Sequence, residues 1–390
     1  MVDYESKLNS SIRKVKPSGI RKYFDISAEM EDVISLSIGE PDFTTPEHIR
    51  NVGIESLRQG QTKYTANKGI TELRECIAEY YNTHYHVPAT ANETLVTVGG
   101  SEALDLALRI LVEPGDEVLI PEPSFVCYAP LTMMRGGNVI SLQTRVEDEF
   151  KLTPELLKSK ITPHSKLLVL AYPNNPTGGI MEREDYEKLV DIIIENDLLV
   201  ISDEIYSSLT YGNRQHCSIA SLPGMKERTI IVNGFSKAYA MTGWRLGYAI
   251  APLPIIKEMT KLHQYGIMSA PTTAQYAAME ALRTGDPDIA YMRAAYDKRR
   301  RYIVDAFNEL GLNCFEPRGA FYCFPSIQST GLSSDEFCDQ LIARKHVAVI
   351  PGTAFGASGE GFIRVSYCSS QEDLETAVAR ISEFLKEIRA

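Results

Sequence analysis

The sequence predicts an α/β protein with a mainly parallel sheet wrapped by helices and a smaller α+β domain. Between about residues 90 and 250, short runs rich in Val, Ile and Leu alternate with helical patterns, the order expected of β-α-β units. Two of these runs, 166–173 and 198–202, are almost entirely apolar, as in strands covered on both faces. Beyond residue 290 shorter strands mix with helices, which indicates a second domain.

Each element of the larger domain follows from its own pattern. Strands are predicted where apolar and β-branched residues run together, and helices where apolar residues recur at spacings of three and four. A strand over 93–100 leads into a helix over 101–112. Further strands are predicted at 116–123, 138–144, 166–173, 198–204, 229–237 and 246–252, and helices at 124–137, 154–161, 182–197 and 271–285.

The smaller domain has strands predicted at 320–325, 347–351 and 362–368 and helices at 291–311, 333–345 and 371–388. A chain of 390 residues exceeds the size at which single cores stop growing. We therefore predict three parts: residues 1–45, which carry turn signals and pack on the small domain, a large domain at 46–290, and a small C-terminal domain at 291–390.

Composition excludes several classes of function. The formal net charge of −11 argues against nucleic acid and anionic membranes as partners. No apolar run approaches the ~18 residues of a membrane span. The seven scattered cysteines contain no Cys-x-x-Cys pair, as expected of free thiols in a reducing compartment. We expect a cytoplasmic protein without a metal site, and His84 and His86 are interpreted as packing or surface residues.

Polar side chains follow three of the predicted buried strands. Asp203 and Tyr206 follow one strand, Asn174 and Asn175 follow another, and Lys237 ends a third. Taken singly, such residues are usually a helix cap, a turn or a solvated lysine. In wrapped parallel sheets, however, ligands gather beyond the carboxyl ends of the strands, so the joint occurrence indicates a binding site.

The motifs TVGGSEAL, YPNNPTG, SDEIY, SKAYAMTGWRLGY and GFIRVSY stand in this order along the chain. In this order they resemble the class I aminotransferases, which bind pyridoxal phosphate on the fold-type I transferase architecture. The stretch 20–46, IRKYFDISAEMEDVISLSIGEPDFTTP, looks most like aromatic amino acid aminotransferases. The resemblance covers nearly the whole chain and implies an enzyme with pyridoxal 5'-phosphate as cofactor.

The resemblance assigns roles to four residues near the cofactor ring. Lys237 matches the lysine that forms a Schiff base with the cofactor and carries protons. Asp203 matches the carboxylate that keeps the pyridine nitrogen protonated. Tyr206 and Asn175 resemble the pair that donates hydrogen bonds to the phenolic oxygen, and Asn175 also lies beside the substrate.

The resemblance also implies a phosphate site. Gly100 precedes a helix start, so the amides of Ser101 and Glu102 are expected to point at an anion with help from the helix dipole. Arg245 is expected to grip the phosphate through parallel hydrogen bonds, and Ser236 is a further donor.

Other positions complete the predicted site. Phe125 matches an aromatic residue that stacks on the cofactor ring. Arg364 matches the arginine that binds the substrate carboxylate, and Gly39 resembles a backbone donor opposite it. Tyr64 resembles a tyrosine that reaches the phosphate of the neighbouring subunit, which implies a homodimer. Gly234 departs from relatives that carry a phosphate-binding serine there, so that side-chain contact is lost.

The resemblance implies transfer of the amino group of an L-amino acid, with an aromatic donor expected, to 2-oxoglutarate by a ping-pong mechanism. Aspartate or alanine aminotransferase and a pyridoxal-phosphate-dependent C-S lyase of the same fold remain alternatives. A transcription regulator with an aminotransferase-like sensor domain is disfavoured, because no helix-turn-helix precedes the cofactor-domain pattern. Side-chain preference is left open, with Arg21 and Tyr128 as candidate pocket residues.

Overall fold

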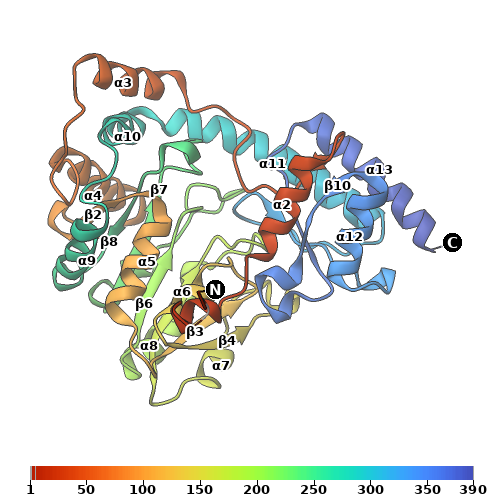
Figure 1. Ribbon diagram of the computed structural model, residues 1–390, viewed down its shortest axis with the longest axis horizontal. Helices are drawn as coiled ribbons and strands as arrows, with labels where there is room; N and C mark the ends of the chain where they lie inside the picture. The colour runs from red at the N-terminus through yellow and green to blue at the C-terminus, as the bar shows by residue number, and fades with distance from the viewer. Residues whose placement is uncertain (1, 5, 390) are drawn as a thin grey trace.

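The computed structural model describes residues 2–4 and 6–389 and contains a seven-stranded central sheet. The strand order is β2-β8-β7-β6-β5-β3-β4 (Figure 1). Only β8 runs against its neighbours, β2 and β7, and the other pairs are parallel. The strands are β2 (Thr94–Thr97), β3 (Glu117–Glu122), β4 (Asn138–Gln143), β5 (Ser165–Ala171), β6 (Leu199–Asp203), β7 (Thr229–Gly234) and β8 (Gly247–Ile250).

Helices cover both faces of this sheet because its strands are apolar on both sides. In β5, Leu167 and Val169 pack toward one face, and Leu168 and Leu170 pack toward the other. The first face is covered by α5 (Gly99–Leu111), α6 (Tyr128–Met134) and α9 (Leu253–Gly266). The second face is covered by α4 (Thr71–Tyr85), α7 (Pro154–Lys158), α8 (Arg183–Glu195) and α10 (Thr272–Thr284), with α3 (Glu47–Arg58) packed outside α10. The predicted α/β architecture is therefore confirmed.

The smaller sheet is antiparallel, in the order β11-β12-β9. Its strands are β9 (Tyr322–Cys323), β11 (Ile350–Pro351) and β12 (Ile363–Ser366). The helices α11 (Asp286–Glu309), α12 (Ser334–Lys345) and α13 (Gln371–Arg389) enclose one apolar core with it. The helix α11 runs without a break through residue 290, so the predicted domain boundary lies inside a helix.

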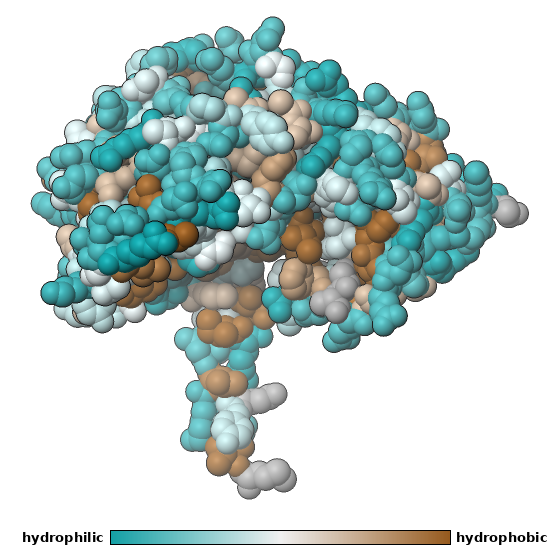
Figure 2. Space-filling model, turned by 90° about the horizontal axis from the view of Figure 1, so that it is seen from above, coloured by the Kyte–Doolittle hydropathy of each residue, from teal (hydrophilic) through white to brown (hydrophobic). Residues whose placement is uncertain are grey.

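The N-terminal segment contributes to the smaller core. The strand β1 (Ile34–Ser35) pairs in parallel with β10 (Val347–Ala348). Tyr23 of α2 (Gly19–Glu29) and Leu36 are buried in that core. Before α2, the short helix α1 (Ser10–Arg13) contacts α6, and the described residues ahead of it project as a narrow arm (Figure 2).

One predicted helix is shorter than expected. The pattern of residues 124–137 predicts a helix from its start, but α6 begins only at Tyr128. The connector before α6 is bonded to the smaller domain instead, because the Ser124 amide donates a hydrogen bond to the carbonyl of Phe355 at 3.0 Å. Phe125 therefore lies on this connector rather than on a helix. No helix of the described residues is long and apolar enough to cross a membrane, and all seven cysteines are free thiols.

Candidate active site

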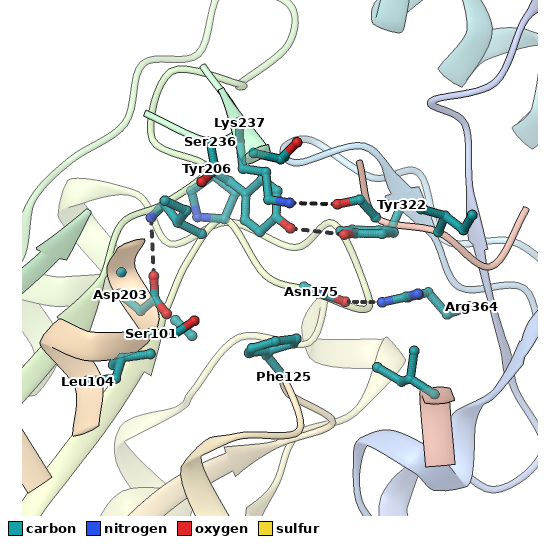
Figure 3. Close-up of a pocket in the computed structure, with 18 of the residues that line it drawn as sticks. Ser101, Leu104, Phe125, Asn175, Asp203, Tyr206, Ser236, Lys237, Tyr322 and Arg364 are labelled. Atoms are coloured by element: carbon teal, nitrogen blue, oxygen red, sulfur yellow. Dashed lines mark hydrogen bonds between the residues drawn. The ribbon is translucent and has the colours of Figure 1, made fainter. Parts of the chain in front are cut away.

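A cavity of about 330 Å³ lies between the carboxyl ends of β5, β6 and β7, the start of α5 and the smaller domain (Figure 3). It forms there because parallel strands end at one edge of the sheet, and the loops that leave them diverge. Most of the residues predicted from the sequence line it: Gly39, Gly100, Ser101, Phe125, Asn175, Asp203, Tyr206, Ser236, Lys237, Arg245 and Arg364.

Lys237 stands in the turn that follows β7 and points into the cavity (Figure 3). Its Nζ donates a hydrogen bond to the carbonyl of Gly39 at 2.6 Å. The pKa of this amine is lowered to about 8, chiefly by burial; Cys368 and Glu40 oppose the shift, and the nearby Arg364 and Arg245 contribute to it. A substantial fraction of Lys237 is therefore a neutral amine at slightly alkaline pH, as a nucleophile or a proton acceptor requires.

Asp203 is the last residue of β6, and the residue as a whole is 7% exposed. It accepts hydrogen bonds from the Tyr128 hydroxyl at 2.8 Å and from the Ile205 amide at 3.2 Å. Burial raises its pKa to about 6 in spite of these bonds. No described residue forms an ion pair with it, so this buried carboxylate lacks a cation.

Tyr206 and Asn175 approach the cavity from the loops after β6 and β5 (Figure 3). The Tyr206 hydroxyl lies 2.9 Å from the hydroxyl of Tyr322. The Oδ1 of Asn175 accepts a hydrogen bond from the Nη1 of Arg364 at 3.1 Å. Asn174 lies beside Asn175 in sequence but holds the turn, accepting from the hydroxyl of Thr177 at 2.9 Å.

The start of α5 faces Arg245. Gly99 has a φ of +73°, and a Cβ on it would lie 2.6 Å from the Nη2 of Arg245, so the guanidinium lies against the backbone of this turn. Ser101 and Ser236 also line the cavity. At Gly234 a Cβ would lie 3.0 Å from the carbonyl of Leu246 and 3.1 Å from the Cα of Gly247, so a side chain there would crowd this backbone.

Arg364 lies on β12, and its guanidinium is buried at the far end of the cavity from Asp203 (Figure 3). It donates to Asn175 and to the backbone carbonyl of Ser37. Its Nε is buried without a hydrogen-bond partner among the described residues. Burial lowers its pKa. A buried cation with a free donor is suited to a carboxylate ligand.

Three predicted residues lie outside the cavity lining. The carboxylate of Glu102 turns away from the cavity and accepts hydrogen bonds from the Val98 amide at 2.5 Å and the His263 ring at 2.7 Å. Tyr64 is 80% exposed on the surface. Arg21 also fails to line the cavity: its side chain points outward and pairs with Asp25 at 2.8 Å, whereas the neighbouring Ile20 and Phe24 of α2 are lining residues.

Tyr322 is the principal lining residue that sequence reasoning missed. It is 1% exposed and contacts both Tyr206 and Arg364. The sequence places it in a short apolar strand, where a tyrosine is indistinguishable from a core residue. Tyr128 could be suggested only as a pocket residue, and its hydrogen bond to Asp203 comes from the structure.

The comparisons with known proteins agree with this geometry. The family model for aminotransferase class I and II matches residues 31–381. The chain belongs to this family. It is 47% identical to an aspartate aminotransferase of Pyrococcus abyssi, over 96% of this chain and 97% of that protein. It is 43% identical to aromatic-amino-acid aminotransferase 2 of Thermococcus litoralis, over 97% and 98%.

A solved structure shows the same fold. The crystal structure of an aromatic aminotransferase from Pyrococcus horikoshii OT3 superposes with a TM-score of 0.90 at 43% identity, covering 95% of this chain and 99% of that one. The chain is therefore an aminotransferase of fold type I, and like its family it depends on pyridoxal phosphate. The relatives include aspartate aminotransferases, an aromatic-amino-acid aminotransferase and a probable N-acetyl-LL-diaminopimelate aminotransferase, which leaves the substrate to be inferred.

Proposed function

We propose that the enzyme transfers the amino group of an L-amino acid, with aromatic donors preferred, to 2-oxoglutarate in two half-reactions. One observation carries this proposal: a single cavity gathers the amine of Lys237, the buried carboxylate of Asp203 and the buried guanidinium of Arg364 between apolar walls.

The residues present fit the cofactor. When bound, pyridoxal phosphate supplies an aldehyde that condenses with amines and a protonated ring that accepts electrons. In the proposal, Asp203 holds that ring nitrogen, which provides the cation that the buried carboxylate lacks. At the other end, Arg245, Ser236 and the amides of Ser101 and Glu102 hold the phosphate, where the N-terminus of α5 favours an anion. Phe125, which lines the cavity, stacks on the ring.

Lys237 carries the proton in this proposal. Its lowered pKa makes the neutral amine available near pH 8, and that amine takes a proton from the α-carbon of the substrate. The same amine then delivers this proton to the aldehyde-derived carbon of the cofactor, which is the carbon that receives the amino group. The carbonyl of Gly39, which now accepts from Nζ, holds the amine inside the cavity between these events.

The substrate is oriented by its carboxylate. Arg364 binds that group, and its unpartnered Nε is available as a donor. Asn175 keeps the guanidinium in place through the bond from Nη1. Because every amino acid has this carboxylate, the same contacts serve the donor and the 2-oxo acid that accepts the amine.

The walls favour an aromatic side chain. Ile20, Phe24 and Ile38 line the cavity. Among the described lining residues the basic ones are Lys237, Arg245 and Arg364, and each has a role in the proposal. No arginine or lysine of the described lining therefore remains to bind the side-chain carboxylate of a donor such as aspartate. An aromatic side chain, by contrast, buries apolar surface against these walls.

Aspartate is the second candidate donor, because Arg21 stands on the same helix as Ile20 and Phe24. Its ion pair with Asp25 is a solvent-exposed i, i+4 pair, with side chains 70% and 54% exposed. Such a pair is worth little. Arg21 can therefore be recruited by a second carboxylate at small expense in free energy.

A homodimer is also part of the proposal. Two segments with exposed apolar side chains, 64–67 and 265–268, lie side by side. The Asn67 side chain of the first donates to the carbonyl of Met268 in the second at 2.8 Å. Tyr64, Tyr265 and Met268 are all exposed there. A second copy of the chain would cover this surface and bring Tyr64 to the neighbouring phosphate site.

The test is a panel of amino acids against 2-oxoglutarate with purified protein, scored by which 2-oxo acid forms. Tyrosine and phenylalanine are expected to give the highest kcat/KM, and Arg21→Ala is expected to leave those values unchanged while lowering that of aspartate. Aspartate or alanine leading the panel would contradict the aromatic preference. Release of ammonia and pyruvate without any acceptor would indicate a C-S lyase instead.

A further inference from the structure

Two tyrosine hydroxyls meet inside the cavity, and one of them has no role in the proposed function. Tyr206 and Tyr322 place their oxygens 2.9 Å apart (Figure 3). Burial raises the pKa of Tyr322 to about 12 and that of Tyr206 well above its ordinary value. Both phenols therefore keep their protons at neutral pH, so the pair holds two protons and shares one hydrogen bond.

The direction of this bond decides what Tyr206 can do. Each hydroxyl has one proton to donate, and neither has another hydrogen-bond partner within the described part of the chain. If Tyr206 donates to Tyr322, its proton is used in that bond and Tyr206 cannot donate to a ligand in the cavity. If Tyr322 donates, the proton of Tyr206 is free to point into the cavity.

We propose that Tyr322 is a positioning residue whose hydroxyl donates to Tyr206 and so directs the Tyr206 proton at the phenolic oxygen of the cofactor. This inference rests on the proposed function, in which Tyr206 is that donor. A hydroxyl that accepts a hydrogen bond becomes a stronger donor. Tyr322 therefore strengthens the bond that Tyr206 makes, without touching the cofactor itself.

The surroundings fix Tyr322 in this position from two sides. Its ring stacks under the Arg364 guanidinium, with the Cζ 4.6 Å from the ring centroid. Its hydroxyl lies against the backbone of Gly39, where a Cβ would come within 2.0 Å of the oxygen. Any side chain at residue 39 would push this hydroxyl away from Tyr206.

The test is a pH titration of the visible absorbance of the cofactor-loaded protein, which follows the proton on the nitrogen that joins Lys237 to the cofactor. A hydrogen bond to the phenolic oxygen stabilises its anion most when that nitrogen is unprotonated, so weakening the bond raises the titration midpoint. We expect Tyr206→Phe to raise the midpoint by about 1 pH unit and Tyr322→Phe by about half a unit.

A double-mutant cycle separates positioning from general structural support. If Tyr322 acts only through Tyr206, Tyr322→Phe shifts nothing in the Tyr206→Phe background. The matched control is Tyr296→Phe, since the Tyr296 hydroxyl is buried without a hydrogen-bond partner in the described structure, and its loss is expected to leave the midpoint unchanged.

Three outcomes would overturn the inference: an unchanged midpoint in Tyr322→Phe, shifts that add in the double variant, or loss of the cofactor from Tyr322→Phe but not from Tyr206→Phe. A wild-type protein that develops no visible band with pyridoxal phosphate would instead refute the proposed function. The two failures are therefore distinguishable.

Discussion

Replacing Asp203 by asparagine is expected to stabilise the cofactor-free protein while it disables the enzyme. The carboxylate is buried, and its pKa is raised by burial from 3.8 to about 6. A raised pKa in a folded acid means that ionisation opposes folding. The stability present below pH 4 is therefore lost as pH rises through about 6.

The magnitude follows from the shift. About two pKa units correspond to about 3 kcal/mol of destabilisation at pH 8. The asparagine removes this destabilisation. It has only one acceptor oxygen for the donors from Tyr128 and Ile205, and the weaker hydrogen bonding costs about 1 kcal/mol. The net gain in the free energy of unfolding is about 2 kcal/mol at pH 8 and clearly smaller at pH 5.

The assay is denaturant unfolding of the cofactor-free protein at both pH values and one fixed concentration. Asp305→Asn is the matched control, because it makes the same substitution at an exposed position on α11. With cofactor and substrates, Asp203→Asn should lower kcat/KM by about 100-fold or more, since one partner of a buried charge pair is lost. A variant that is less stable than wild type at pH 8, or equally affected at both pH values, would refute the reasoning.

Three further predictions follow from the site. The rate at which cofactor-free protein reacts with pyridoxal phosphate should rise with pH and level off above about 8, the pKa of Lys237, in stopped-flow absorbance; a rate still climbing beyond pH 9 would contradict this. Arg364→Lys should lower kcat/KM about 10- to 100-fold through loss of paired donors, and equal kinetics would exclude Arg364 from carboxylate binding. Gly99→Ala, whose Cβ would lie 2.6 Å from Arg245, should weaken cofactor binding about 10-fold in equilibrium dialysis, and unchanged affinity would exclude that contact.

Local sequence patterns predicted the strands of the central sheet and many of the helices because they depend on apolar spacing, but the helices α2, α3, α4 and α9 were not predicted. The runs that became β5, β6 and β7 are apolar on both faces. The sheet brings Asp203, which ends β6, to the same edge as Asn175 and Lys237, which follow β5 and β7. The start of α6 could not be read in the same way. The contact between Ser124 and Phe355 that holds the preceding connector joins residues far apart in sequence.

Side chains whose role depends on tertiary neighbours were the hardest to predict. Tyr322 looks like a core tyrosine until the structure places its hydroxyl beside Tyr206. For Arg21 the error ran the other way. Arg21 was a candidate pocket residue, but its side chain points to solvent, and Ile20 and Phe24 of the same helix line the cavity. The roles of Tyr64 and Glu102 stay predictions. The role of Tyr64 requires a second copy of the chain, and the role of Glu102 belongs to its backbone amide and not to its side chain.

The most direct test of the central claim is borohydride reduction of the protein in the presence of pyridoxal phosphate, followed by tryptic digestion and mass spectrometry. We predict one labelled peptide, residues 229–245, that trypsin has not cut at Lys237. A label on any other lysine, or no label at all under conditions where the protein binds the cofactor, would contradict the claim that Lys237 forms the covalent bond.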